Sequence, residues 1–385
     1  MTEYSRQMKF RDIPGHERLK SDLRSLVNSG HIPHAIMISG PSGSGKMMLA
    51  RAYAQYLHCE HPTDGEPCGV CRSCRLHQDL SHPDLHFIYP IVKNDRQKRA
   101  VSADLAEEWG RMLWECPAMS PERWLELLDA KNSQPAIYVS DANEIVLADS
   151  YPPYTSKYKI FIIWQPERLQ PAAANKLLKV IEEPSDGTLF ILVSNNELQL
   201  LPTIFSRVQR FHAGRQSDTD IAAYLSRRHG LDAEMAARYA RLCNGSIIRA
   251  DELGSNTGEN EKFLTVYQEL MRSAYAKRVA RLKSLSEEVA AYGREKTQRF
   301  LIYVSRMIRE NFIYNMKTPS LTAMTPEEET FSSRFSPFIN HLNIEDFAAE
   351  TDRARTDISR NANAKLVLFD YFLICIILLH RKPKS

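Results

Sequence analysis

A glycine-rich run that ends in a lysine is the first segment with residue types that could do chemistry. Its glycines and its lysine are Gly40, Gly43, Gly45 and Lys46. The run follows an apolar stretch, a context in which backbone N–H groups and a helix N-terminus cradle phosphate. The next residue is Met47, where a hydroxyl side chain normally binds Mg²⁺. The sequence therefore predicts a phosphate loop without its metal ligand.

The second half of such a site is an Asp-Glu pair at the end of a nearby strand. After the apolar run 159–163 the chain has Trp164 and Gln165, neither of which carries negative charge. We expect Glu167, a few residues on, to face elsewhere. Losing both metal-holding elements should abolish hydrolysis by the chain itself, so no catalytic magnesium is expected. Weak binding of ATP or ADP and a loop kept only for packing both remain open.

Four cysteines form the second chemical cluster. Cys59, Cys68, Cys71 and Cys74 lie within sixteen residues, among turn-forming Pro and Gly residues. Four thiolates at this spacing can surround Zn²⁺ and leave no position open for catalysis, which is typical of a structural site. We predict a structural zinc module over residues 58–75. His58 and His61 could substitute as ligands, and a redox role fits the tight packing poorly.

The other cysteines, Cys116, Cys243 and Cys375, stand alone and are expected in hydrophobic cores. The 385 residues, 43% hydrophobic and 25% charged, indicate a folded protein of two or three domains. The net charge of +3 does not by itself indicate nucleic-acid binding. No secretory signal or membrane span is expected, because the longest apolar run, 371–379, is too short. The predicted location is the cytoplasm.

The elements that position these groups follow an α/β pattern from residue 10 to about 211. The apolar runs 35–39, 159–163 and 189–193 are each followed by a turn and a helix-compatible stretch, which predicts a parallel sheet. Ligands bind at the carboxyl ends of the strands in such sheets. Residues 102–114 are expected to be helical, but we assign no chemistry to the region 89–158.

The pattern becomes helical after residue 211. Short helices are expected over 217–249, with Gly230 and Gly245 as helix stops. A polar linker is predicted at 254–261, followed by helices to the end of the chain.

Several segments together resemble bacterial clamp-loader subunits of DNA polymerase III, which belong to the AAA+ proteins. The segments are 10–16, 173–184 with its L-L-K-x-x-E-E-P signature, and 200–209, which is similar to T-I-x-S-R-C-Q. The resemblance implies an AAA+ P-loop domain with the zinc module over 1–213, a helical lid over 214–256 and an all-helical collar over 257–385.

The resemblance also implies a role. The chain would be a non-hydrolysing, delta-prime type of subunit in a hetero-pentamer with ATPase subunits and delta. That assembly would load the sliding clamp onto primed DNA during replication. Arg207 falls at the position of an arginine finger, which stabilises the ATP of a neighbouring subunit in trans. Ser194 and Asn195 fall at the family's polar sensing position, and Gly245, Ser246 and Arg249 resemble the second sensor.

Two other functions remain open from the sequence. The chain could be an ATP-hydrolysing motor subunit, although Met47, Trp164 and Gln165 supply no metal ligand. It could also be a scaffold whose zinc finger binds DNA. Against that function, Arg72 is opposed within the cysteine segment by Glu60, Asp64 and Glu66.

Overall fold

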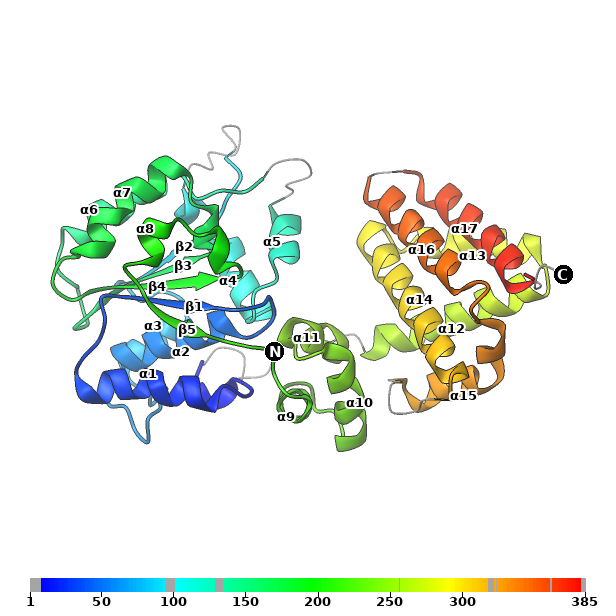
Figure 1. Cartoon of the computed structure of the whole chain (residues 1–385), viewed down its shortest axis with the longest axis horizontal. Helices are drawn as coiled ribbons and strands as arrows, with labels where there is room; N and C mark the ends of the chain where they lie inside the picture. Colours follow the sequence, from blue (N-terminus) through cyan, green and yellow to red (C-terminus); the bar gives the residue numbers. More distant parts are fainter. Residues whose placement is uncertain are drawn as a thin grey trace. The chain divides into compact units, whose positions relative to one another are not determined.

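The computed structural model describes residues 8–93, 101–128, 134–255, 257–317, 322, 324–360 and 362–381. The chain divides into two compact units, Met1–Gly254 and Ser255–Ser385. The first unit contains a sheet covered by helices, and the second is helical (Figure 1).

A five-stranded parallel sheet forms the centre of the first unit, with the strand order β2-β3-β4-β1-β5. The strands are β1 (Ala35–Ser39), β2 (Leu85–Ile88), β3 (Lys159–Trp164), β4 (Thr188–Ser194) and β5 (Gln209–His212). The three strands predicted from the apolar runs are confirmed as β1, β3 and β4. All three are buried along their whole length, as expected for a sheet covered on both faces.

The register of the sheet determines which strand ends meet. Ser39 of β1 pairs with Ser194 of β4, and Val193 of β4 pairs with Trp164 of β3. Because β4 lies between β1 and β3, its carboxyl end separates the glycine-rich loop from the residues that follow Trp164.

Alternate residues of β1 point into two different cores, since successive strand side chains face opposite sides of a sheet. Ile36 and Ile38 join the core beneath α1 and α2, whereas Ala35 and Met37 join the core beneath α6, α7 and α8. Figure 1 shows these two groups of helices on opposite faces of the sheet. The helices packed around the sheet are α1 (Glu17–Ser29), α2 (Lys46–His58), α3 (Arg72–Gln78), α4 (Ala106–Glu115), α5 (Pro121–Leu127), α6 (Val139–Asp149), α7 (Pro171–Glu182) and α8 (Pro202–Phe205).

The region 89–158 builds an aromatic core. The predicted helix near residues 102–114 is confirmed as a 3-10 turn, Ser102–Leu105, followed by α4. Trp109 stacks on Tyr89 with ring centroids 3.9 Å apart and lies 5.4 Å from both Trp124 and Trp164. Residues 94–100 and 129–133 of this region lie outside the described residues.

Three helices complete the first unit: α9 (Asp218–His229), α10 (Ala233–Cys243) and α11 (Ile247–Ser255). Gly230 caps α9 in the left-handed conformation, as predicted. The helix end predicted at Gly245 lies one residue too far along the chain. Asn244 is the left-handed C-cap of α10, a conformation that asparagine tolerates. The Asp251 carboxylate joins α11 to α9 through Tyr224 Oη at 2.9 Å and Arg228 Nε at 2.9 Å.

The predicted polar linker at 254–261 is wrong. Helix α11 continues to Ser255 and α12 begins at Thr257. Weak helix formers cost at most about 1 kcal/mol per residue, so a polar composition alone does not exclude a helix. The second unit contains α12 (Thr257–Tyr275), α13 (Val279–Ala290), α14 (Arg294–Asn315), α15 (Pro326–Phe335), α16 (Ile344–Ser359) and α17 (Ala364–Leu379).

Helix α17 is apolar on both of its faces. Leu368, Tyr371 and Phe372 are buried in the core of the second unit, yet Leu366 and Ile377 are 69% and 68% exposed. In the part of the chain that the structure describes, no helix is both long and apolar enough to cross a membrane. Cys375 of α17 is buried, as are Cys116 and Cys243 in the first unit, so the expectation for the lone cysteines is confirmed.

Candidate functional site

The glycine-rich loop connects β1 to α2 and needs glycine at three positions. Gly40, Gly43 and Gly45 have φ angles of +149°, +81° and +88°, which residues with a Cβ rarely adopt. Helix α2 begins at Lys46, directly after Gly45, so the loop leads into a helix N-terminus. The structure thus brings together all four residues predicted for the phosphate loop.

Replacing Gly40 by alanine should destabilise the first unit by at least about 3 kcal/mol. A Cβ at this position would lie 2.0 Å from the carbonyl oxygen of Ala213, a backbone atom that cannot rotate away. Gly30→Ala is the matched control, since Gly30 also has a positive φ but nothing within 4 Å, and it should cost about 1 kcal/mol. Urea unfolding followed by tryptophan fluorescence measures both, and equal losses would contradict the predicted clash.

The lysine of the loop is bound to the loop itself. Lys46 is 4% exposed, and its Nζ donates to the carbonyl oxygens of Gly40 at 2.8 Å and Pro41 at 2.6 Å. Burial lowers the pKa of Lys46 to about 7, although the nearby Glu167 carboxylate acts to raise it. The ammonium group is thus held by acceptors of its own loop.

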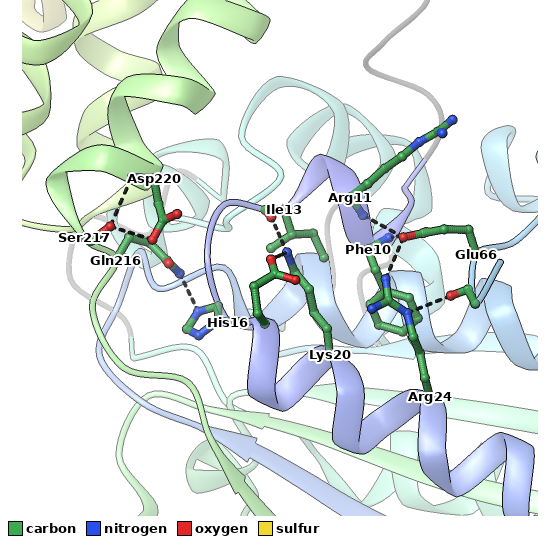
Figure 2. Close-up of polar contacts among 12 residues, drawn as sticks. Phe10, Arg11, Ile13, His16, Lys20, Arg24, Glu66, Gln216, Ser217 and Asp220 are labelled. Carbon is green, nitrogen blue, oxygen red and sulfur yellow. Dashed lines mark hydrogen bonds and ion pairs between the residues drawn. The ribbon is translucent and has the colours of Figure 1, made fainter.

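The glycine-rich loop accepts hydrogen bonds from α11 and from two segments that are distant in sequence. The N–H of Ile247 donates to the carbonyl oxygen of Gly43 at 2.8 Å. The Ser44 carbonyl oxygen accepts from Gln216 Nε2 at 2.9 Å and from His16 Nε2 at 2.7 Å. Figure 2 shows Gln216 and His16 directed toward one another. Hydrogen bonds from other segments of the chain therefore fix two carbonyl oxygens of the loop.

Trp164 and Gln165, at the positions of the metal-holding acids, supply no oxygen anion, as expected from the sequence. Trp164 is buried in the aromatic core, and Gln165 is buried in a left-handed conformation with φ +53°. Met47 is also buried, with an exposure of 1%. None of these three residues offers the carboxylate or hydroxyl oxygen that normally holds Mg²⁺ at such positions.

The expectation that Glu167 faces elsewhere is wrong. Its carboxylate accepts from Ser194 Oγ at 2.9 Å and from the Asn195 N–H at 3.1 Å. The turn Pro166–Arg168 after the left-handed Gln165 brings Glu167 back to the end of β4. Its negative charge therefore lies near Lys46, with both oxygens engaged by the predicted sensing residues. The second predicted sensor residue, Arg249, is exposed on α11.

Arg207 lies on the surface between α8 and β5. Its side chain is 32% exposed, while the adjacent Ile204 and Val208 are buried beneath α7. Nε donates to Glu182 Oε2 at 2.8 Å and Nη1 donates to the Thr203 carbonyl oxygen at 2.8 Å. Among the described residues, Nη2 has no hydrogen-bond partner. The guanidinium is thus available to a group outside this unit.

The four cysteines predicted as metal ligands converge. Their Sγ atoms all lie within 4.8 Å of one another, and those of Cys68 and Cys74 are 3.9 Å apart. Four thiolates about 2.3 Å from zinc in a tetrahedron would have sulfur–sulfur edges of about 3.8 Å, so the donor set fits zinc. Backbone N–H groups of Val70 and Cys71 donate to Cys68 Sγ at 3.5 Å and 3.4 Å. Burial acts to raise the pKa of Cys68, but these bonds, together with hydrogen bonds from the side chains of Cys59 and Cys71, lower it to about 6.

A second observation at the cysteine cluster concerns Gln55 of α2. Burial raises the pKa of the Cys74 thiol, and the neighbouring Gln55 amide acts to lower it. The Gln55 side chain is itself buried, and within the described part of the chain its Nε2 has no acceptor at ordinary hydrogen-bond distance. A metal-bound thiolate of Cys74 would supply one, since ligating groups are commonly held by hydrogen bonds from a surrounding shell of residues.

The two histidines considered as substitute ligands do not join the cysteines. His61 is exposed, and His58 Nε2 donates to the Tyr158 carbonyl oxygen at 2.8 Å. His58 Nδ1 then accepts from His77 Nε2 at 2.9 Å. Burial lowers the pKa of His58 to about 3 and also lowers the pKa values of His77 and His82, so these rings are neutral. His58 stacks on His82 at 4.2 Å, an arrangement typical of a hydrogen-bonded core.

A carboxylate in the cysteine segment binds the N-terminal segment of the chain (Figure 2). Glu66 accepts from the backbone N–H groups of Phe10 at 2.8 Å and Arg11 at 3.0 Å, and from Arg24 Nη2 at 2.7 Å. Arg24 Nε also donates to the Gly65 carbonyl oxygen at 2.8 Å. Through Glu66, the cysteine segment therefore holds the backbone of Phe10 and Arg11 in place.

Replacing Glu66 by glutamine should speed amide hydrogen exchange at Phe10 and Arg11 by about tenfold, because hydrogen bonds to a charged acceptor are roughly twice as strong as neutral ones. Asp64→Asn is the control: Asp64 is exposed, and asparagine tolerates its φ of +54°. Mass spectrometry of exchange over residues 8–15 makes the measurement. Unchanged exchange in the Glu66 variant would contradict the role of this carboxylate.

The parallel sheet and the glycine loop between β1 and α2 place the protein among P-loop α/β proteins. A family model described as "DNA polymerase III, delta subunit" matches residues 15–216, more than half of the chain. The chain therefore belongs to this family of clamp-loader subunits, and the predicted family resemblance is confirmed.

Relatives of two kinds match about half of the chain. DNA polymerase III subunit delta' of Haemophilus influenzae is 33% identical over 180 residues, which are 47% of this chain and 42% of that protein. Subunit gamma/tau of Mycobacterium tuberculosis is 29% identical over 206 residues, which are 54% of this chain and 28% of that protein. The chain thus spans less than half the length of these relatives.

A solved structure of a DNA polymerase III gamma subunit-related protein from Thermotoga maritima is also similar. It is 15% identical, with a TM-score of 0.45, and the alignment covers 93% of this chain and 99% of that one.

Proposed function

We propose that this chain is a non-hydrolysing, delta-prime type of subunit of the DNA polymerase III clamp loader, which presents Arg207 to ATP bound by a neighbouring ATPase subunit. The observation that carries the proposal is a partly exposed Arg207 whose Nη2 has no hydrogen-bond partner among the described residues, on a chain with Met47 at the magnesium-binding position of its phosphate loop. An always-charged guanidinium can fork onto phosphate oxygens and stabilise the charge that develops in phosphoryl transfer.

The missing metal ligands and a Lys46 held by its own loop support a non-hydrolysing subunit over an ATPase of the gamma/tau kind. Lys46 donates to loop carbonyls, and Ile247 and Gln216 donate to the carbonyls of Gly43 and Ser44. Phosphoryl transfer depends on metal ions that neutralise the developing charge, and Met47 cannot hold one. Glu167 adds negative charge near Lys46, but Ser194 and Asn195 occupy both of its oxygens.

The helices of the second unit support a role in assembly. A helix that is apolar all round is normally buried, and the exposed Leu366 and Ile377 leave part of α17 uncovered within this chain. In our proposal 1–213 is the AAA+ domain, 214–256 the lid and 257–385 a collar whose α17 packs against other subunits. The partners would be the ATPase subunits and delta in a cytoplasmic hetero-pentamer, and the sliding clamp and primed DNA through that complex.

In this proposal the four cysteines hold a structural zinc ion. Zinc would contribute folding energy locally and would fix the segment that carries Glu66, which in turn holds Phe10 and Arg11. Four thiolates leave no coordination position open on the ion, so it would take no part in phosphoryl transfer.

Copurification with a tagged chain tests the proposal. We expect ATPase subunits to copurify, the complex to hydrolyse ATP in response to clamp and primed DNA, and the isolated chain to show no turnover above background. Turnover by the isolated chain would instead support the motor function. Salt-dependent DNA binding that is lost on mutating Arg72 and Arg75 would support the zinc-finger function.

A further inference from the structure

We propose that Glu182 is a positioning residue for Arg207, which holds the guanidinium in the orientation that meets the neighbour's phosphate. This inference rests on the proposed function, because it assigns a partner to the arginine that acts in trans. Glu182 is the last residue of α7, and Arg207 follows α8.

The contacts of Arg207 determine how its planar guanidinium is oriented. Glu182 Oε2 accepts from Nε at 2.8 Å, and the Thr203 carbonyl oxygen accepts from Nη1 at 2.8 Å. Nη1 also donates to Ser206 Oγ at 3.4 Å. Acceptors on two different nitrogens restrict both the direction of the side chain and the rotation of its plane. Nη2 has no partner among the described residues, so it is the group left to contact a phosphate oxygen.

The acceptors themselves are held by a packed core. Ile181 of α7 and Ile204 of α8 are fully buried in the same cluster, together with Val208 next to the arginine. Glu182 and Thr203 thus belong to elements whose separation is set by packing. The side chain of Glu182 is 53% exposed, so the pair with Arg207 is expected to add little stability and to act mainly through geometry.

The position of Glu182 in its helix also needs an explanation. A carboxylate in the last turn of a helix faces the negative end of the helix dipole, which disfavours it. Pairing with the Arg207 guanidinium offsets this repulsion. Glu183, which follows it, is exposed and has no hydrogen bond to Arg207 among the described contacts, so it provides a matched control at the same helix end.

The test compares complexes assembled with Glu182→Gln, Glu183→Gln, Arg207→Ala and the double variant Glu182→Gln/Arg207→Ala. We expect Glu182→Gln to lower kcat for ATP about 3- to 10-fold with KM unchanged, because a transition-state contact is lost without a change in ground-state binding. Glu183→Gln should stay within about twofold of the parent. The double variant should match Arg207→Ala, since a residue that acts only through Arg207 has no effect without it.

The outcomes separate the two proposals. If Arg207→Ala lowers turnover but Glu182→Gln leaves or raises it, Glu182 is not a positioning residue and the trans role of Arg207 stands. An additive loss in the double variant would also overturn the inference. If Arg207→Ala itself has no effect, the proposed function fails. Assembly is checked by size-exclusion chromatography. If Glu182→Gln fails to assemble, Glu182→Asp takes its place, and its kcat should fall less than about 3-fold because a carboxylate is kept.

Discussion

Arg207→Ala should leave the chain folded and slow ATP hydrolysis by the assembled complex by as much as ~10³-fold at the affected interface. The reason is electrostatic: a guanidinium fixed at the interface stabilises negative charge that grows on the transferring phosphoryl group, and alanine leaves it uncompensated. Folding should survive because Arg207 is partly exposed and its one ion pair, with Glu182, is also exposed. Steady-state turnover of the complex with clamp and primed DNA measures the effect.

Arg210→Ala is the control for this variant. Arg210 lies three residues further on, and its guanidinium stacks 4.5 Å from the ring centroid of Phe205 rather than on an acidic side chain. Its loss removes the same charge from the same surface and should change turnover only slightly. Unchanged turnover in the Arg207 variant, or equal losses in the two variants, would contradict a specific role for Arg207.

Replacing Cys71 and Cys74 together by serine should reduce bound zinc from about one ion per chain to none. Two thiolates cannot complete the tetrahedron, and the binding energy that orders the segment is then lost. Cys74 is fully buried, so its region should open as well. Because Glu66 belongs to this segment, amide exchange at Phe10 and Arg11 should quicken too, linking metal loss to the N-terminal segment.

Cys243→Ser provides the matched control for the double variant. Cys243 is also buried, but it lies in α10, and its Sγ donates to the Tyr239 carbonyl oxygen at 3.0 Å, a bond that serine can keep. This variant should retain zinc. Stoichiometric zinc in the Cys71/Cys74 variant, measured by elemental analysis of the purified chain, would show that these thiols are not ligands.

Local patterns carried much of the information about this protein. The apolar runs predicted β1, β3 and β4, because a strand buried on both faces needs an unbroken apolar segment. The glycines of the loop were identifiable because only glycine readily takes their positive φ angles. The four cysteines were recognised from their spacing, since thiols so close in sequence need little tertiary structure to converge.

Contacts between distant segments could not be read from the sequence. Glu167 reaches the end of β4 only because Gln165 turns the backbone, and Glu66 reaches Phe10 only because the cysteine segment folds back on α1. The sequence shows that Glu167 follows a predicted strand within two or three residues. It does not show which way the Glu167 side chain points.

The sequence alone determined the residue types available: a glycine-rich loop that ends in a lysine, no acid or hydroxyl at the usual magnesium positions, four closely spaced thiols and an arginine in a family motif. Only the tertiary structure decided which groups contact them. Lys46 donates to loop carbonyl oxygens, the Ile247 N–H donates to the Gly43 carbonyl oxygen, and Arg207 pairs with Glu182. The physical reason is that backbone preferences and apolar periodicity are local. Hydrogen bonds and ion pairs between distant residues depend on how whole elements pack.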